Sequence, residues 1–325
     1  MAYEKAAENA CNALKIAKQE KVVIITDVAK EFFAKVLAEE IIKRGASLDY
    51  FVIEDYGTRP YALPGNILNS FEKADAGFIM NDQIKGEYAI FKKPLLDMPE
   101  KNKKLRLATM PGISREMLDD SMLADFDKVD EFSQKVYDFI STGKKLKIKT
   151  EKGTNLTALV GKYNWVKSTG LIKPGTWGNI PSGEVYTTPY SISGNVVVDG
   201  TVCGSINQDA YQNPVKMIIQ DSKIMWVHCK DKDLEQKILK DINTDENASV
   251  IGELAFGTNI FIKRLIGHGL QDEKYPGVHF ANGDPIGEKT GAKWESKTHT
   301  DHIITRANVW LDGKQLMENG KYLIK

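Results

Sequence analysis

Residues 1–140 alternate between strand and helix patterns, and this alternation is the strongest constraint on the fold. Short apolar runs, each typical of a buried parallel strand, lie at 22–25, 48–53, 76–80 and 105–109. Apolar residues recur at helical spacing from Phe32 to Ile42, where Gly45 can end the helix, and a longer helix is predicted at 122–140. Strand and helix in repetition predict a doubly wound sheet, so we expect an α/β, Rossmann-like domain at 1–145.

This first domain lacks the signature of a dinucleotide-binding sheet. A nicotinamide-dependent enzyme has a glycine-rich turn after its first strand, because backbone amides must approach the pyrophosphate closely. Here the first strand leads into Thr26–Ala29, which contains no glycine. We therefore expect the domain to serve as a scaffold or a dimerisation domain.

The pattern changes near residue 145. From Leu146 onward, short alternating runs are separated by Gly, Pro and Asn turns, and a helix is expected near 234–242. These features predict a β-rich α+β domain at 146–325. The residues with candidate chemistry lie in this second domain.

The balance of charge excludes several classes of partner. The chain has 44 Lys and Arg residues against 44 Asp and Glu residues, so its formal charge is zero. Nucleic-acid grooves and polybasic membrane patches need a cationic excess. Three scattered cysteines, Cys11, Cys203 and Cys229, indicate neither a disulfide framework nor a zinc knuckle, and they suit a reducing compartment. We therefore expect a cytoplasmic protein without nucleic-acid or membrane partners.

Four of the five histidines lie in the last 60 residues, and one of them shares a strand pattern with an acid. In the run Thr298–Ile304, side chains two residues apart lie on the same face of a strand. His299 and Asp301 therefore point together, whereas His302 points away. An imidazole and a carboxylate on one face are suitable ligands for a divalent cation.

His279, Glu184 and Glu253 are polar side chains in apolar, glycine-containing surroundings. If buried and unpaired, such a charge would cost on the order of 3–5 kcal/mol. A bound metal would explain all three. We interpret the remaining two histidines, His228 and His268, as structural residues.

The segments that carry these residues resemble, in the same order, the motifs of the aminopeptidase T family, peptidase family M29. They are Asn179–Pro189, Gly252–Leu254, Gly277–Gly283 and His299–Asp301. In the first half, Ala108–Ile113 is similar to shorter relatives that are usually labelled leucyl aminopeptidases. The resemblance spans most of the second half of the chain.

The resemblance implies a metalloprotease, a hydrolase that removes N-terminal residues from small peptides through a metal-activated water. It implies two divalent metals per chain, with Zn, Co or Mn favoured by a donor set without thiolates. It also implies a homodimer. The residues that match the family's ligands are Glu184, Glu253, His279, His299 and Asp301. One of the glutamates, Glu184 or Glu253, would exchange protons with the water.

Two other functions are compatible with the same residues. The related 2,5-dihydroxypyridine 5,6-dioxygenase uses one Fe(II), and His279, His299 and Asp301 would supply a facial triad of its type, with the glutamates outside the ligand set. A non-catalytic metal-dependent binder is the third hypothesis. It is favoured by Ile286, which stands where the M29 peptidases have a tyrosine seven residues after their motif histidine.

Overall fold

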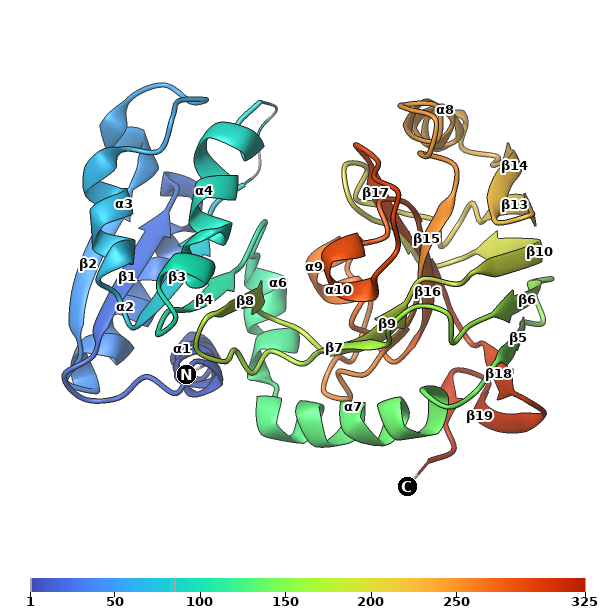
Figure 1. Ribbon diagram of the computed structural model, residues 1–325, viewed down its shortest axis with the longest axis horizontal. Helices are drawn as coiled ribbons and strands as arrows, with labels where there is room; N and C mark the ends of the chain where they lie inside the picture. The colour runs from blue at the N-terminus through green and yellow to red at the C-terminus, as the bar shows by residue number, and fades with distance from the viewer. Residues whose placement is uncertain (1, 83, 85, 325) are drawn as a thin grey trace. The chain divides into compact units, whose positions relative to one another are not determined.

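The computed structural model describes residues 2–82, 84 and 86–324, and the chain divides into two compact units. The first unit comprises residues 1–128 and 170–182, and the second comprises 129–169 and 183–325. Figure 1 shows a sheet flanked by helices in the first unit and mainly strands in the second. The fold is mixed α/β, with one parallel sheet and two antiparallel sheets.

The first unit contains a five-stranded parallel sheet, sheet A, in the order β2-β1-β3-β4-β8. Its strands are β1 (Lys21–Thr26), β2 (Ser47–Val52), β3 (Ala76–Met80), β4 (Arg106–Thr109) and β8 (Thr176–Asn179). The four strand positions predicted from the apolar runs are thereby confirmed as β1 to β4. Because β1 has β2 and β3 on either side, the connections run in both directions from it, as expected for a doubly wound sheet.

Helices cover both faces of sheet A (Figure 1). They are α1 (Ala2–Ala13), α2 (Glu31–Lys43), α3 (Gly65–Glu72), α4 (Lys93–Leu96), α5 (Met98–Lys101) and α6 (Arg115–Leu118), with the 3₁₀ helices η1 (Val28–Lys30), η2 (Ile53–Tyr56) and η4 (Ser121–Leu123) and the π-helix η3 (Tyr88–Lys92). The predicted end of α2 is confirmed, since Gly45 has a φ of 79° and its amide donates to the carbonyl of Ile42. No described helix is long and apolar enough to cross a membrane.

The boundaries of the two units differ from the single position expected at residue 145. Helix α7 (Phe126–Ile140) contains the first boundary, because Val136 and Ile140 belong to the core of the second unit. The chain later returns to the first unit, where β8 pairs in parallel with β4. The sequence of β8, Thr-Trp-Gly-Asn, has no apolar alternation, so only its long-range pairing makes it a strand.

The second unit contains two antiparallel sheets packed around one hydrophobic core. Sheet B has eight strands in the order β14-β13-β10-β6-β5-β18-β19-β20 and sheet C has seven in the order β12-β11-β17-β16-β15-β9-β7. Sheet B is made of β5 (Lys145–Lys149), β6 (Asn155–Leu159), β10 (Ser191–Val198), β13 (Val215–Gln220), β14 (Lys223–His228), β18 (Asn308–Leu311), β19 (Lys314–Glu318) and β20 (Lys321–Tyr322). Sheet C is made of β7 (Val166–Ser168), β9 (Glu184–Thr187), β11 (Thr201–Val202), β12 (Gln208–Asp209), β15 (Ile251–Gly257), β16 (Gly277–Gly283) and β17 (His299–Ile304).

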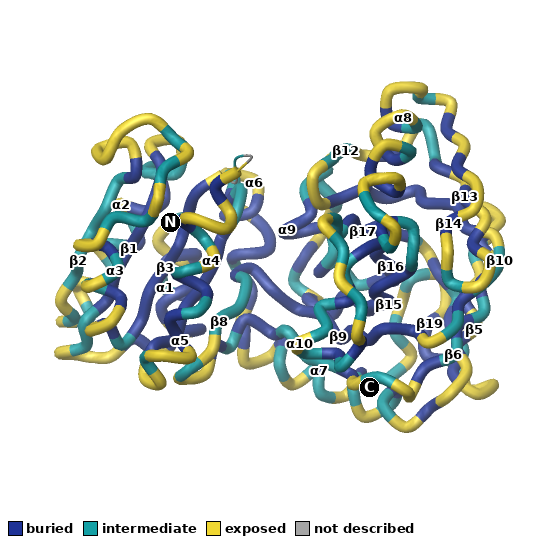
Figure 2. The backbone as a smooth tube through the Cα atoms, turned by 45° about the horizontal axis from the view of Figure 1, so that its top comes forward, coloured by how far each residue is buried: buried dark blue, intermediate teal, exposed yellow. Residues whose placement is uncertain are grey.

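Three helices complete the second unit: α8 (Lys232–Asp241), α9 (Gly269–Asp272) and α10 (Gly287–Thr290). Helix α8 confirms the helix expected near 234–242. Strands β15 and β16 are buried along their whole length, as Figure 2 shows in dark blue. The residues with candidate chemistry lie on these strands and on their neighbours in sheet C.

Candidate metal centre

Strand alternation places the predicted site residues on one face of sheet C. Leu254 and Phe280 belong to the core between the sheets, so the residues beside them, Glu253 and His279, face the opposite side. The same holds on β9, where Val185 is in the core and Glu184 precedes it. Side chains therefore alternate between the core and the opposite face on β9, β15 and β16, as expected for strands.

Small residues lie between the candidate ligands on this face. Ala281 pairs with Glu253 on one side and with Asp301 on the other. Because neighbouring strands are about 4.8 Å apart, these two carboxylates extend from backbone positions nearly 10 Å apart. Only the methyl group of Ala281 lies between them, and this leaves room for the long side chains to converge over the sheet.

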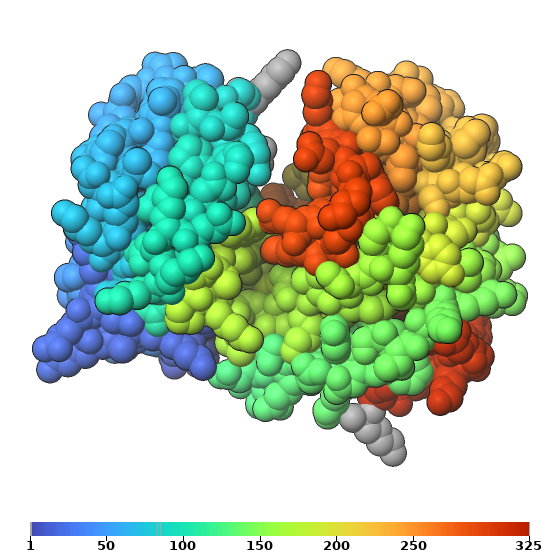
Figure 3. Space-filling model, in the orientation of Figure 1, coloured from blue at the N-terminus to red at the C-terminus, as the bar shows by residue number. Residues whose placement is uncertain are grey.

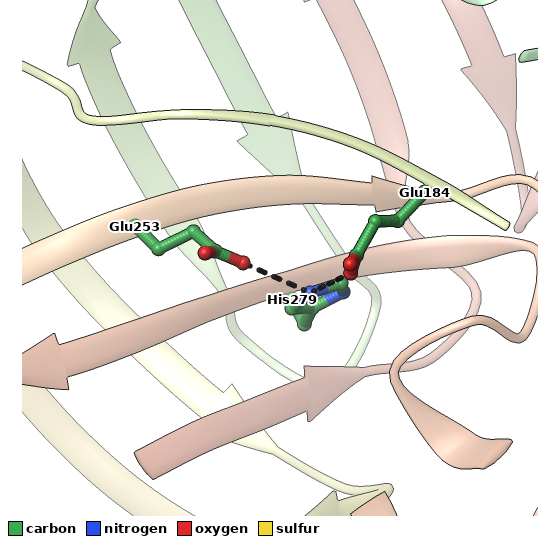
Figure 4. A group of neighbouring side chains, drawn as sticks. All are labelled: Glu184, Glu253 and His279. Atoms are coloured by element: carbon green, nitrogen blue, oxygen red, sulfur yellow. Dashed lines mark ion pairs between the residues drawn. The ribbon is translucent and has the colours of Figure 1, made fainter. Parts of the chain in front are cut away.

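The first group of converging donors comes from β9, β15 and β16. Nε2 of His279 lies 3.5 Å from Oε2 of Glu184 and 3.4 Å from Oε1 of Glu253. Figure 4 shows the two carboxylates pointing toward the imidazole from opposite sides. All three residues are buried, and their ligand atoms lie within 4.8 Å of one another.

The second group comes from β15 and β17 and shares Glu253 with the first. Nε2 of His299 lies 3.8 Å from Oε2 of Glu253 and 3.7 Å from Oδ1 of Asp301. Nδ1 of His299 lies 2.8 Å from the carbonyl oxygen of Asp284, which can only accept, so Nδ1 carries the proton. In its neutral form the ring therefore presents Nε2 to the carboxylates with its lone pair free, as a metal ligand must.

These contacts fit a bound cation better than direct hydrogen bonds. Nε2 of His279 and Oδ1 of Asp301 are buried and have no hydrogen-bond partner among the described residues, which is costly unless another group satisfies them. Two ligand atoms each ~2.1 Å from a tetrahedral cation lie ~3.4 Å apart. The separations between the histidine nitrogens and carboxylate oxygens within the two groups, 3.4 to 3.8 Å, are close to that spacing. The donor set, two imidazoles and three carboxylates, suits divalent transition metals.

The metal-free cluster holds protons unusually tightly. Burial by itself would lower the pKa of His279, but the adjacent Glu184 and Glu253 raise it to about 10. Burial has the same effect on His299, whose pKa the charges of Asp301 and Glu253 raise to about 9. Burial, followed by the charge of Glu273, raises the pKa of Asp301 to about 8. Metal binding must displace these protons, so it is coupled to pH.

The sequence reasoning did not predict Lys274, which lies beside the first group. Its Nζ is 2.6 Å from Oε1 of Glu184 and 2.6 Å from Oε1 of Glu273. Burial by itself would raise the pKa of Glu184, but Lys274 and the His279 contact lower it to about 2. A lysine in a Lys-Tyr-Pro-Gly turn is usually a surface residue, and nothing local in the sequence distinguishes this one.

Tyr186 is a second side chain at the site that the sequence reasoning did not predict. It lies two residues after Glu184 on β9 and pairs with Ala255, which in turn pairs with His279. Burial, and then the charges of Glu253 and Glu184, raise the pKa of Tyr186 well above its ordinary value. The phenol is therefore a neutral donor. The two-residue spacing from Glu184 could have indicated that Tyr186 lies at the site, since residues two apart on a strand share a face.

The other histidines have structural surroundings. His302 points to the core side, where its ring stacks on Phe280 and its Nε2 lies 2.7 Å from Oδ1 of Asn282. The prediction that His302 faces away from His299 is therefore confirmed. His228 stacks on Trp226 at the surface, and Nδ1 of His268 accepts from the Leu270 amide at the start of α9.

The segment 284–298 follows β16 and supports the site through Asp284. Ile286 in this segment has a φ of 52° and a ψ of 52°, a left-handed conformation that is rare for a β-branched residue. Its amide donates to Oδ1 of Asp284 over 2.8 Å. Helix α10 lies at the surface of the unit in Figure 3.

Two solved structures have the same fold. The chain is 16% identical to 2,5-dihydroxypyridine dioxygenase from Pseudomonas putida KT2440, with a TM-score of 0.72 over 99% of this chain and 97% of the other. It is 18% identical to wild-type AmpT from Thermus thermophilus, with a TM-score of 0.71 over 99% of both chains. No curated protein matches the sequence.

The family of the protein is shown by its sequence. Residues 108–322 match the profile of the thermophilic metalloproteases (M29), and this range includes all five candidate ligands. The match covers about two thirds of the chain and nearly the whole second unit. The protein therefore belongs to the thermophilic metalloprotease (M29) family.

Proposed function

We propose that the protein is a metal-dependent aminopeptidase that hydrolyses N-terminal residues of small peptides. The observation that carries this proposal is the sharing of Glu253 between two donor groups that contain one histidine each. Such an arrangement suits two adjacent cations joined by a carboxylate, as in two-metal hydrolases. Membership of the M29 family supports the same reaction class.

The proposed ligands divide into three roles. Glu253 would contribute to both metal sites, because Oε1 faces His279 and Oε2 faces His299. Glu184 and His279 complete one site, and His299 and Asp301 complete the other. Bound zinc, cobalt or manganese would supply the Lewis acidity that activates water and polarises the scissile carbonyl.

Side chains of the protein would exchange protons with the water and position the substrate. Glu184 or Glu253 would exchange a proton with the attacking water when one of its oxygens is not engaged as a ligand, since each carboxylate projects among the donors. Tyr186 lies on the same face as Glu184 and is a neutral phenol, so it can donate a hydrogen bond to the substrate. It provides a phenol in a site where Ile286 replaces the family tyrosine.

The second candidate function is an Fe(II)-dependent ring-cleaving dioxygenase. It is supported by the structural similarity to the Pseudomonas enzyme and by Oδ1 of Asp301, which lies 3.9 Å from His279 and 3.7 Å from His299. Against it, the two histidines fall into different donor groups, whereas a facial triad gathers its three ligands around one ion.

Metal analysis and two assays distinguish the candidates. Protein purified without added metal salts is analysed for metal, and then assayed with aminoacyl chromogenic amides and for oxygen uptake on dihydroxylated heteroaromatic rings. Two zinc, cobalt or manganese ions per chain with amide turnover would support the aminopeptidase. One iron with oxygen uptake would support the dioxygenase instead.

Single substitutions test the site in the same assays. Glu253→Ala and His299→Ala should each abolish turnover and lower the metal content, because both remove a proposed ligand. Full metal content in both variants would refute the ligand assignment. Metal binding without either activity would leave the metal-dependent binder as the function.

A further inference from the structure

Lys274 is a buried cation beside one of the two donor groups. Its side chain is 2% exposed, and its ammonium contacts Glu184 and Glu273. Burial by itself would lower the pKa of this amine, but the two carboxylates raise it, so the side chain is positively charged at neutral pH. Glu273 belongs to neither donor group.

Backbone hydrogen bonds hold this lysine in place. Its amide donates to the carbonyl of Gln271 over 2.9 Å, and its carbonyl accepts from the amide of Asn259 over 3.0 Å. The backbone of the next residue, Tyr275, lies directly against Gly257 of β15. The backbone that carries the Lys274 side chain is therefore held in place. The ammonium has a defined position relative to a metal ion that binds in the site.

The two donor groups differ in their electrostatic surroundings. Glu184 in the first group is paired with Lys274, whereas in the described part of the chain the ion pairs of Asp301 in the second group join it only to His279 and His299. The second group is also more accessible, since the His299 side chain is 30% exposed.

We propose that Lys274 makes the two metal sites unequal, so that Glu253, His299 and Asp301 bind the first divalent cation tightly and Glu184 and His279 bind the second weakly. This inference rests on the two-cation site proposed above. The ammonium of Lys274 forms an ion pair with Oε1 of Glu184, so this carboxylate has only its other oxygen for a metal. Its charge also repels a divalent cation a few ångströms away, and burial strengthens this repulsion.

A titration of the metal-stripped protein with Mn²⁺ tests the proposal, with free Mn²⁺ measured by its EPR signal. The wild-type protein should bind two ions in separate steps. In Lys274→Met the weaker step should tighten at least tenfold, or about 1.4 kcal/mol, and the tighter step should change much less. The matched control is Lys152→Met, which removes the lysine paired with buried Asp199 at 2.8 Å elsewhere in the unit.

A double variant guards against misfolding. Removal of Lys274 alone leaves the buried carboxylate of Glu184 and the partly buried carboxylate of Glu273 without their cation, and an unpaired buried charge destabilises a protein strongly. Lys274→Met combined with Glu273→Gln removes the positive charge and one negative charge together. The weaker step should tighten in this variant too, and its circular dichroism should match the wild type.

Two further variants assign the steps. Glu184→Gln should remove the weaker step and leave the tighter one, whereas Asp301→Asn should remove the tighter one. The proposal would be overturned if the weaker step stayed unchanged or became weaker without Lys274, or if Glu184→Gln removed the tighter step and Asp301→Asn the weaker one. Either result would leave metal-dependent amide turnover, and so the proposed function, untouched. Conversely, tightening without any amide turnover would support unequal sites and refute the aminopeptidase.

Discussion

A Cβ atom on Gly257 would lie 1.9 Å from the carbonyl oxygen of Tyr275. This distance is far shorter than a van der Waals contact, so only glycine allows the turn at 274–275 to lie on strand β15. Gly257 pairs with Glu184 on one side and Gly277 on the other. The packing of backbone on backbone thus determines where Lys274 meets Glu184.

Gly257→Ala should therefore disturb both the fold and the site. We expect the free energy of unfolding to fall by about 1–3 kcal/mol, as for other overpacked positions, and the metal affinity to change because the turn must move. Chemical denaturation and Mn²⁺ titration measure the two effects. Gly65→Ala is the control, since a Cβ there meets nothing within 4 Å; equal effects of the two substitutions would contradict the explanation.

Substitution of the two histidines in the run His299–His302 should have different effects: one should mainly lower stability and the other should mainly remove the metal. His302→Ala removes a buried hydrogen bond to Asn282 and a stacked ring, so the free energy of unfolding should fall by about 2–4 kcal/mol while the folded protein keeps its metal. His299→Ala should cost less stability and lose metal. Metal content and denaturation curves of both variants decide this, and metal loss on substitution of His302 would contradict the assignment.

The metal-free protein should become less stable as the pH rises. The folded pKa values of His279 and His299, about 10 and about 9, exceed the ordinary 6.5, so the folded state keeps protons that the unfolded state has released. The raised pKa of Asp301, about 8, acts in the same direction. Their stabilising effect is complete at low pH and is lost as the pH rises through these values.

The expected loss of stability is at least ~2 kcal/mol between pH ~6 and pH ~10, since one pKa unit corresponds to about 1.4 kcal/mol. Denaturation at a series of pH values, with and without Zn²⁺, measures it. Bound metal should remove most of the decline, because it replaces the protons. A metal-free protein with constant stability over this range would show that the cluster does not hold the protons.

Tyr186→Phe should lower kcat for a chromogenic aminoacyl amide by about tenfold or more while the metal content stays unchanged. The expected cause is the loss of a hydrogen bond from the phenol to the reacting groups. Tyr190→Phe, at an exposed position on the same segment, is the control. Equal turnover by the Tyr186 variant and the wild type would exclude a catalytic role for this phenol.

Local patterns in the sequence were sufficient for several features of the fold. The apolar runs predicted β1 to β4, because a strand buried on both faces needs a continuous apolar sequence. The period of two predicted that His299 and Asp301 share a face and that His302 does not. Strand β8 was not predicted, since this four-residue strand lacks an apolar run and is formed by its pairing with β4 rather than by its own composition.

The sequence by itself determined the kinds of donor atom at the site and which of them share a face of their own strand, because both follow from residue type and strand period. Only the tertiary structure decided which donors meet. The order of β9, β15, β16 and β17 and their register bring Glu184 to His279 and place Glu253 between two histidines. Close backbone packing at Gly257 positions Lys274 beside the site, and local sequence patterns do not predict such contacts between distant segments.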